Sequence, residues 1–271
     1  MKKFIIPACL LALNVIFFTA CKKTGLSSRN DASADAIALK DQSSSDLVAF
    51  KGDELKNNID KLVEKLHWVE QACFRIDVNP YTVYIDPNSV PSNVKADLIL
   101  ITHPHGDHWS TEELDKIVKP GTILIAPQEV VYTRNIAQRI VLKPGEQFKA
   151  FGKIKIEAVP AYNIDKVWFH PKEANWVGYL ITINGVTIYH AGDTERIPEM
   201  TTFTADIAMV PLGQTYTFNT VNDAAEAAKD VHAKVAIPMH FGLYEGTAAD
   251  AVMFQTLLQG FMPVIIKEKG Q

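Results

Sequence analysis

The amino-acid sequence predicts an α/β (α+β) fold in which β-sheets form layers covered by helices. Of the 271 residues, 47% are hydrophobic and 21% charged, which is ordinary for a globular chain with a sizeable core. Short β-rich runs alternate with helical patterns along the chain. From Asp46 onward no low-complexity stretch or repeat interrupts this alternation. Residues 46–271 should therefore form one domain.

The predicted strands are short runs of branched aliphatic and aromatic side chains, bounded by residues that favour turns. In chain order they cover residues 82–85, 98–102, 122–126, 154–160, 177–183, 186–189, 207–212, 235–239 and 263–267. Helical patterns cover residues 111–118, 129–138, 221–231 and 248–258. Thr220, with Asp223 three residues later, supplies a capping signal for the third helix.

The N-terminus has the pattern of a bacterial secretory signal. Lys2 and Lys3 precede an apolar run over residues 4–18, which is short for a membrane span. Small residues before Cys21 resemble the lipobox of bacterial lipoproteins, so we expect a signal peptide over residues 1–20 and a lipid on Cys21. An uncleaved anchor helix and a plain signal peptide are the alternatives. The prediction places the protein outside the cytoplasm, anchored to the cell envelope.

Between this signal and the domain, residues 21–45 are rich in Ser, Asp, Ala and Lys and carry no aromatic residue, which predicts a flexible tether. Cys73 is then the one cysteine of the domain, and its apolar surroundings favour a buried core position over a reactive thiol. The formal net charge is -4, without a basic cluster, so a nucleic-acid partner is not expected.

The strongest chemical signal follows the apolar run that ends at Thr102. The next six residues read His-Pro-His-Gly-Asp-His and contain four metal-ligand side chains: His103, His105, Asp107 and His108. Imidazole and carboxylate groups presented together at the end of a buried strand predict a metal centre. His103 and His105 can hold one ion, while Asp107 and His108 turn toward a second.

This segment resembles the hallmark of the metallo-β-lactamase superfamily, His-x-His-x-Asp-His after a strand. The resemblance implies a four-layer αββα sandwich of two mixed sheets flanked by helices. It also implies that Asp193, in the segment Tyr-His-Ala-Gly-Asp-Thr, bridges two metal ions and that His240, in Ile-Pro-Met-His-Phe-Gly, is the last ligand. The phrasing around both residues resembles the branch that contains ascorbate-phosphate lactonase, and β-lactam hydrolysis is not expected.

One position departs from the family pattern. Members usually carry a third histidine for the first ion where this chain has Asn163, and an amide oxygen is a weak ligand for zinc. The first site would then hold His103, His105 and Asp193, and His170 in the next loop is a candidate replacement ligand. The resemblance therefore leaves either one ion, at the second site, or two. Zinc is the default metal, with manganese and iron as alternatives.

The expected function is hydrolysis of a small ester, lactone or phosphodiester by metal-activated water, with Asp107 orienting the water and passing a proton to the leaving group. A phospholipase acting on the nearby membrane is one alternative, which a continuous apolar rim would favour. A metal-binding or sensing domain without catalysis is another. Residues 163–172 and 214–218 are expected to set specificity, and His190 to support a ligand or fill a strand end.

Overall fold

The computed structural model describes residues 44–270. The predicted signal peptide, the lipidation site and nearly all of the predicted tether therefore lie outside the described residues. The contact pattern divides the chain between Val48 and Ala49, and the description below concerns the unit that begins at Ala49. Helix α2 (Ser44–Val63) crosses that boundary. Within residues 44–270 no helix has the length and apolar character needed to cross a bilayer.

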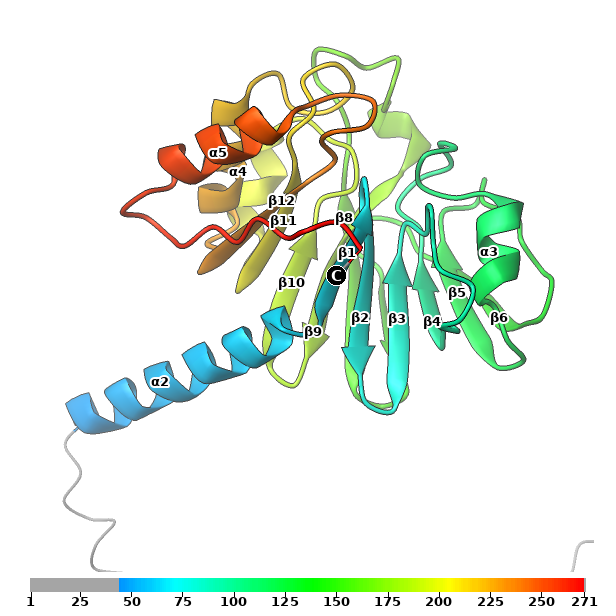
Figure 1. Ribbon diagram of the computed structural model, residues 1–271, viewed down its shortest axis with the longest axis horizontal. Helices are drawn as coiled ribbons and strands as arrows, with labels where there is room; N and C mark the ends of the chain where they lie inside the picture. The colour runs from blue at the N-terminus through cyan, green and yellow to red at the C-terminus, as the bar shows by residue number, and fades with distance from the viewer. Residues whose placement is uncertain (1–43, 271) are drawn as a thin grey trace, which may run out of the picture. The chain divides into compact units, whose positions relative to one another are not determined.

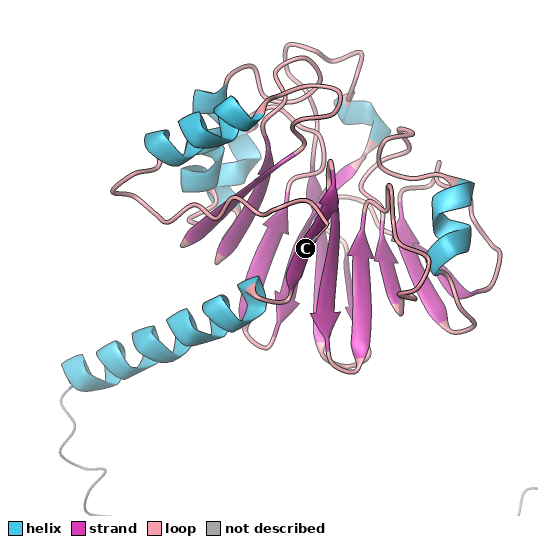
Figure 2. Ribbon diagram, in the orientation of Figure 1, coloured by secondary structure: helices cyan, strands magenta, loops and turns pink. Residues whose placement is uncertain are grey.

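Two six-stranded mixed sheets form the centre of this unit (Figures 1 and 2). In the first sheet the strands follow chain order, β1 to β3 antiparallel and β3 to β6 parallel. Its strands are β1 (Leu66–Glu70), β2 (Cys73–Val78), β3 (Tyr81–Ile85), β4 (Leu98–Leu100), β5 (Thr122–Ala126) and β6 (Ile136–Val141).

The second sheet has the order β12-β11-β10-β9-β8-β7, antiparallel from β7 to β10 and parallel from β10 to β12. Its strands are β7 (Gln147–Ala150), β8 (Ile154–Pro160), β9 (Val177–Ile183), β10 (Val186–His190), β11 (Ile207–Pro211) and β12 (Val235–Met239). The remaining elements are the helices α3 (Thr111–Ile117), α4 (Val221–Asp230) and α5 (Ala248–Leu257) and the 3-10 turns η2 (Lys172–Ala174) and η3 (Pro198–Thr202).

The order of layers follows from which face of each strand is buried. Side chains alternate along β2, so Phe74 and Ile76 join the large core shared with the second sheet, whereas Cys73 joins a smaller core with Leu114 and Ile117 of α3. Helix α4 packs its alanine-rich face on the other side, next to β11 (Figure 1). Helix, sheet, sheet and helix thus form the predicted four-layer sandwich, and the predicted core position of Cys73 is confirmed.

The predicted helix over residues 129–138 is wrong. The structure has a loop there, followed by β6, which pairs in parallel with β5. Val130, Val131 and Tyr132 are β-branched or aromatic residues with modest helix propensity, and burial of Val130 and Tyr132 in the smaller core holds the segment extended. The guanidinium of Arg139 donates to three carbonyls of this loop, those of residues 127, 128 and 130.

The predicted strand over residues 263–267 forms only one β-bridge, between Val264 and Ala236 of β12. Ala236 donates to the carbonyl of Pro263 and accepts from the N–H of Ile265. The next rung would need an N–H from Pro238, which proline lacks, so the ladder ends there. The sequence patterns also failed to predict α2, β1, β2 and β7, because the apolar runs in these segments are short or interrupted by polar residues.

Candidate metal centre

The predicted ligands meet because strands of both sheets end at the same edge of the sandwich. His103 comes three residues after β4, Asp193 comes three residues after β10, and His240 directly follows β12. Asp86, which was not predicted as a ligand, directly follows β3 at the same edge. Gly192 allows the β10 loop to approach the first sheet closely, since it has φ +65° and a Cβ there would lie 3.0 Å from the Thr102 side chain. The two sheets thereby contribute side chains to one cluster.

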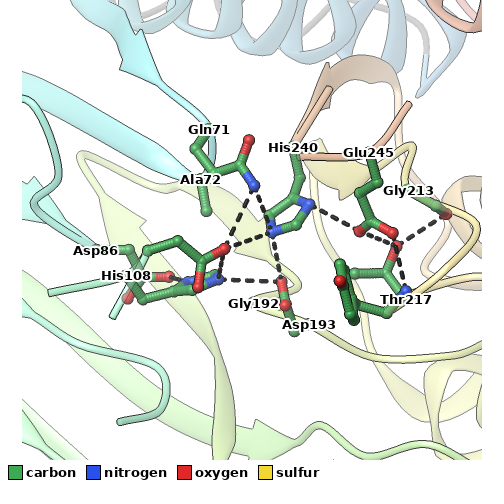
Figure 3. Close-up of polar contacts among 12 residues, drawn as sticks. Gln71, Ala72, Asp86, His108, Gly192, Asp193, Gly213, Thr217, His240 and Glu245 are labelled. Carbon is green, nitrogen blue, oxygen red and sulfur yellow. Dashed lines mark hydrogen bonds and ion pairs between the residues drawn. The ribbon is translucent and has the colours of Figure 1, made fainter. Parts of the chain in front are cut away.

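The carboxylate of Asp193 lies between two groups of ligand atoms. Its Oδ2 is 3.7 Å from His103 Nε2, and His105 completes this first site. Its Oδ1 is 3.3 Å from His108 Nε2 and 3.4 Å from His240 Nε2, on the side of the second site (Figure 3). Asp107 joins the second site, with Oδ2 3.6 Å from His108 Nε2 and 3.4 Å from His240 Nε2.

The second site has the spacing of a tetrahedral metal site. Four ligand atoms around zinc at about 2.0–2.1 Å lie about 3.3–3.4 Å from one another. The four separations given above for the second site span 3.3 to 3.6 Å. Moreover, His103 Nε2, His108 Nε2 and Asp193 Oδ1 are buried without a hydrogen-bond partner, a condition that costs about 1–3 kcal/mol for each group unless something binds it. The donor set therefore fits divalent metal ions.

Contacts behind the ligands hold the rings of three histidines, and Nε2 of His103 and of His108 has no hydrogen-bond partner. Nδ1 of His108 lies 2.9 Å from Asp86 Oδ2, and Nδ1 of His240 lies 3.0 Å from Glu245 Oε1. Asp86 accepts a hydrogen bond from His108 Nδ1, and Glu245 is the ion-pair partner of His240 Nδ1, so Nε2 of each ring faces the site. The Thr102 hydroxyl donates to Asp86 and can therefore only accept from His103 Nδ1, 2.9 Å away.

The pKa values of the histidines are shifted in opposite directions at the two sites. Burial, reinforced by neighbouring His108, lowers the pKa of His103 well below its usual value, so its imidazole is neutral and could bind a metal ion. Burial also opposes a charge on His240, but Asp193, Asp107 and Glu245 outweigh it and raise the pKa of His240 to about 9. Asp193 stays ionised, because the nearby histidines outweigh burial and hold its pKa well below the usual range.

The two alternatives for a third first-site ligand differ in their contacts. The amide of Asn163 donates to the carbonyls of Lys166 and Tyr216 and so ties two loops together, while its Oδ1 has no partner. His170 is 1% exposed, its ring centroid lies 4.8 Å from that of His103, and neither nitrogen has a well-formed hydrogen bond. Burial lowers the pKa of His170 to about 3. His170 therefore offers a free imidazole beside the first site.

Three residues of the centre were missed by the sequence analysis: Gln71, Asp86 and Glu245 (Figure 3). Asp86 could have been noticed as an acidic residue directly after a buried strand. Nothing local marks Gln71 or Glu245. Gln71, Asp86 and His240 all have positive φ, between 44° and 57°, a strain of order 1–3 kcal/mol for each residue that surrounding contacts must hold.

His190 and Lys172, which the sequence analysis also considered, make structural contacts. His190 uses both ring nitrogens, Nε2 toward the Ala72 carbonyl at 2.9 Å and Nδ1 accepting from the Gly192 N–H, so it is not free to bind a metal. Lys172 bonds to Glu199 and to the Tyr162 hydroxyl rather than facing the centre.

The Glu245 carboxylate occupies space that is open only because residue 213 is a glycine. A Cβ on Gly213 would lie 1.6 Å from Glu245 Oε1, so we expect Gly213→Ala to push this carboxylate away from His240. Metal affinity should fall about 10-fold to 100-fold, as for lost partners of ligating histidines. Chelator competition on the purified protein measures this. Gly52→Ala, on an exposed part of α2 with open space around the new methyl, should leave the affinity unchanged; equal affinity of both variants would contradict the expectation.

Comparison with known proteins agrees with this geometry. Residues 65–240 match the β-lactamase superfamily domain. The UPF0173 metal-dependent hydrolase of Geobacillus sp. (strain WCH70) is 33% identical over 225 residues, 75% of this chain and 96% of that protein. The corresponding protein of Thermoplasma acidophilum is 33% identical over 210 residues, 71% of this chain and 90% of its own length.

Among solved structures, a candidate metal-dependent hydrolase from Parabacteroides distasonis superposes with a TM-score of 0.67 at 32% identity, covering 75% of this chain and 92% of that one. Igni18, a metallo hydrolase from Ignicoccus hospitalis, shares the fold with a TM-score of 0.63 at 23% identity, over 76% of this chain and 95% of its own. The resemblance drawn from the sequence is thus confirmed. The chain belongs to the β-lactamase superfamily, within its UPF0173 family of metal-dependent hydrolases.

Proposed function

We propose that the protein hydrolyses a small acyl substrate, such as an ester or lactone, at a centre of two divalent metal ions, zinc by default. The observation that carries this is the placement of Asp193, whose two oxygens face two separate groups of buried ligand atoms. A divalent ion in such a site lowers the pKa of water to about 7 and so supplies hydroxide at neutral pH. In the overall reaction the acyl C–O bond breaks, the acyl carbon gains the hydroxyl of water, and the leaving oxygen gains its proton.

Asp107 is our candidate for moving that proton. Its side chain is 23% exposed, and it lines the cavity that opens onto the centre. Burial opposes its ionisation, but the hydrogen bond with His240 and the charge of His108 outweigh this and lower its pKa. An ionised carboxylate that faces the cavity can take a proton from the attacking water and return it to the leaving group.

Metal analysis of the full chain tests the centre. We expect two ions in the wild type, one in His170→Ala because the first site loses its neutral third ligand, and two in the control His67→Ala. His67 pairs with Asp77 away from the centre. Ester hydrolysis should stop after chelation and return with zinc. Two ions in His170→Ala would reject the role of His170, and hydrolysis that survives complete chelation would reject the proposed function.

Gln71 is proposed as a positioning residue for Asp107. It is fully buried, its amide nitrogen donates to Asp107 Oδ2 at 3.3 Å and lies 3.0 Å from His240 Nε2. A hydrogen bond to a charged group contributes about 1.5–3 kcal/mol. Gln71→Met should therefore lower kcat about 10-fold to 100-fold with KM and metal content unchanged. Gln255→Met, at an exposed amide of α5, is the matched control; a change in KM alone would contradict the role.

Proton competition should make metal binding depend on pH. In the metal-free protein the pKa of His240 is about 9, so below that value zinc must displace a proton. Burial opposes a charge on His108 as well, but Asp193 and Asp86 outweigh it and raise the pKa of His108 well above its usual value. Apparent affinity should therefore weaken by at least about tenfold per pH unit from 9 toward 6.5, measured by chelator competition. Conversely, protonated His240 stabilises the metal-free fold below pH 6.5, and this contribution is lost as pH rises through 9. An affinity that does not vary with pH would contradict this account.

We also propose that the protein is exported and lipid-anchored through Cys21, on the pattern of residues 1–21. Labelling of cells with radioactive palmitate should mark the wild type and not Cys21→Ser. Equal labelling of both would reject the lipid anchor.

A further inference from the structure

A cavity of about 390 Å³ opens onto the metal centre, within the usual range for small-molecule sites. Apart from the metal-site residues, its lining consists of aromatic rings: Phe169, Tyr216 and Tyr244. Phe169 and Tyr216 contact each other edge to face, with centroids 4.8 Å apart. The wall beside the ligands is therefore aromatic and carries no charged side chain.

Large apolar side chains continue outward from this wall. The ring of Trp168 lies beside that of Phe169, tilted by 56° with centroids 5.9 Å apart, and Trp168 is 71% exposed. Ile164 and Val167, in the same loop as Trp168, are also exposed, as are Leu243 and Tyr244 in the loop after β12. Exposed apolar groups on loops that line a cavity indicate a binding surface rather than scattered surface residues.

The described lining of the cavity contains no Lys or Arg. Lys166, the lysine in the adjoining loop, is directed instead to the Thr217 carbonyl and lies 3.6 Å from the Glu195 carboxylate. Lys172 is held by Glu199. A phosphate or carboxylate on the substrate would therefore meet no lysine or arginine partner here.

The backbone N–H groups of these loops are already bonded to buried carboxylates. Glu195 accepts from the N–H groups of residues 164, 165 and 166 at 2.7–3.0 Å. Glu245 accepts from those of Thr215 and Tyr216, both at 2.8 Å. Loop N–H groups that could otherwise cradle an anion are therefore unavailable for it. The same bonds, with the Asn163 bridge to Tyr216, hold the wall in place before a ligand arrives.

The net charge of the metal centre also disfavours an anionic substrate. Asp107 and Asp193 lie in it, and Asp86 and Glu245 lie directly behind it. These four carboxylates would balance two divalent cations, leaving no excess positive charge to attract an anion.

From these observations we infer that the substrate is a small neutral ester or lactone whose aromatic or alkyl group packs on Phe169, Tyr216 and Tyr244. The inference rests on the proposed hydrolase function and adds the substrate class. Packing against the aromatic side chains is the main attraction, because burial of apolar surface is the favourable contribution that this lining can supply.

A matched pair of esters tests the class with the zinc-loaded full chain. We expect kcat/KM for phenyl butyrate to exceed that for 4-carboxyphenyl butyrate at least tenfold. Tyr216→Ala and Tyr244→Ala should each raise KM for phenyl butyrate about tenfold with metal content unchanged, and the Phe variants should retain most of the affinity. Phe261→Ala, which removes an exposed aromatic ring outside this cavity, is the control. Preference for the carboxylated ester, or no effect of either Ala variant, would overturn the inference.

Binding separates failure of the substrate class from failure of the reaction. Butyrophenone and 4-butyrylbenzoate are ketones that cannot be hydrolysed, and calorimetry measures their binding to the same protein. Tighter binding of the neutral ketone supports the class even if no ester is turned over, whereas equal or weaker binding overturns it. Faster hydrolysis of phosphatidylcholine vesicles than of phenyl butyrate would also overturn it, in favour of a lipid substrate.

Discussion

Replacing Asp193 by alanine is expected to empty both metal sites and lower kcat/KM at least about 10³-fold, equivalent to about 4 kcal/mol of transition-state stabilisation. The carboxylate is buried, and its two oxygens lie 3.7 Å from His103 Nε2 and 3.3 Å from His108 Nε2. Its removal takes a ligand from each site and the balancing negative charge from both. Metal content by mass spectrometry should fall from two ions per chain to less than one.

The control for this experiment is Asp115→Ala. Asp115, on helix α3, pairs with Arg134 and with the Tyr132 hydroxyl and is not one of the candidate ligands. It should lose a surface interaction of less than about 1 kcal/mol and keep its metal. If Asp193→Ala retained two ions and near-normal turnover, the shared carboxylate would not be the link between the sites.

The second large effect is expected from Asp86→Asn, although Asp86 touches no metal position itself. Its Oδ1 accepts the Thr102 N–H at 2.7 Å, and its Oδ2 accepts from the Thr102 hydroxyl at 2.7 Å and from His108 Nδ1 at 2.9 Å. An amide has one acceptor oxygen, so its NH₂ must face at least one of these donors. We expect metal affinity to fall 10-fold to 100-fold, as for lost carboxylate–histidine pairs.

Asp86→Asn should also destabilise the metal-free protein by about 1–3 kcal/mol, because a buried donor loses its partner. Asp97→Asn is the matched control, since Asp97 accepts the Thr82 N–H and pairs with Lys119 at the opposite end of the same strands. It should reduce stability in thermal unfolding without changing metal affinity. Wild-type metal affinity in Asp86→Asn would show that His108 does not depend on this carboxylate.

The sequence correctly predicted elements that have a strongly apolar run or a local capping signal. The strands over residues 122–126, 154–160, 177–183 and 235–239 have the predicted bounds. Helix α5 begins one residue after Thr247, which caps it together with Asp250. The segment 129–138 failed for the opposite reason: its conformation depends on burial of Val130 and Tyr132 and on pairing with β5, which are contacts between distant residues.

The sequence by itself determined the superfamily and identified six ligand candidates. Four of them lie within residues 103–108, and Asp193 and His240 each follow a recognisable apolar strand. Only the tertiary structure decided which groups complete the centre. Gln71 and Glu245 reach it from a hairpin and a loop 174 positions apart, given their numbers in the chain, and His170 rather than the neighbouring loop amide presents free nitrogens to His103. Such partners are selected by the packing of two sheets, and packing between distant segments leaves no periodic trace in the chain.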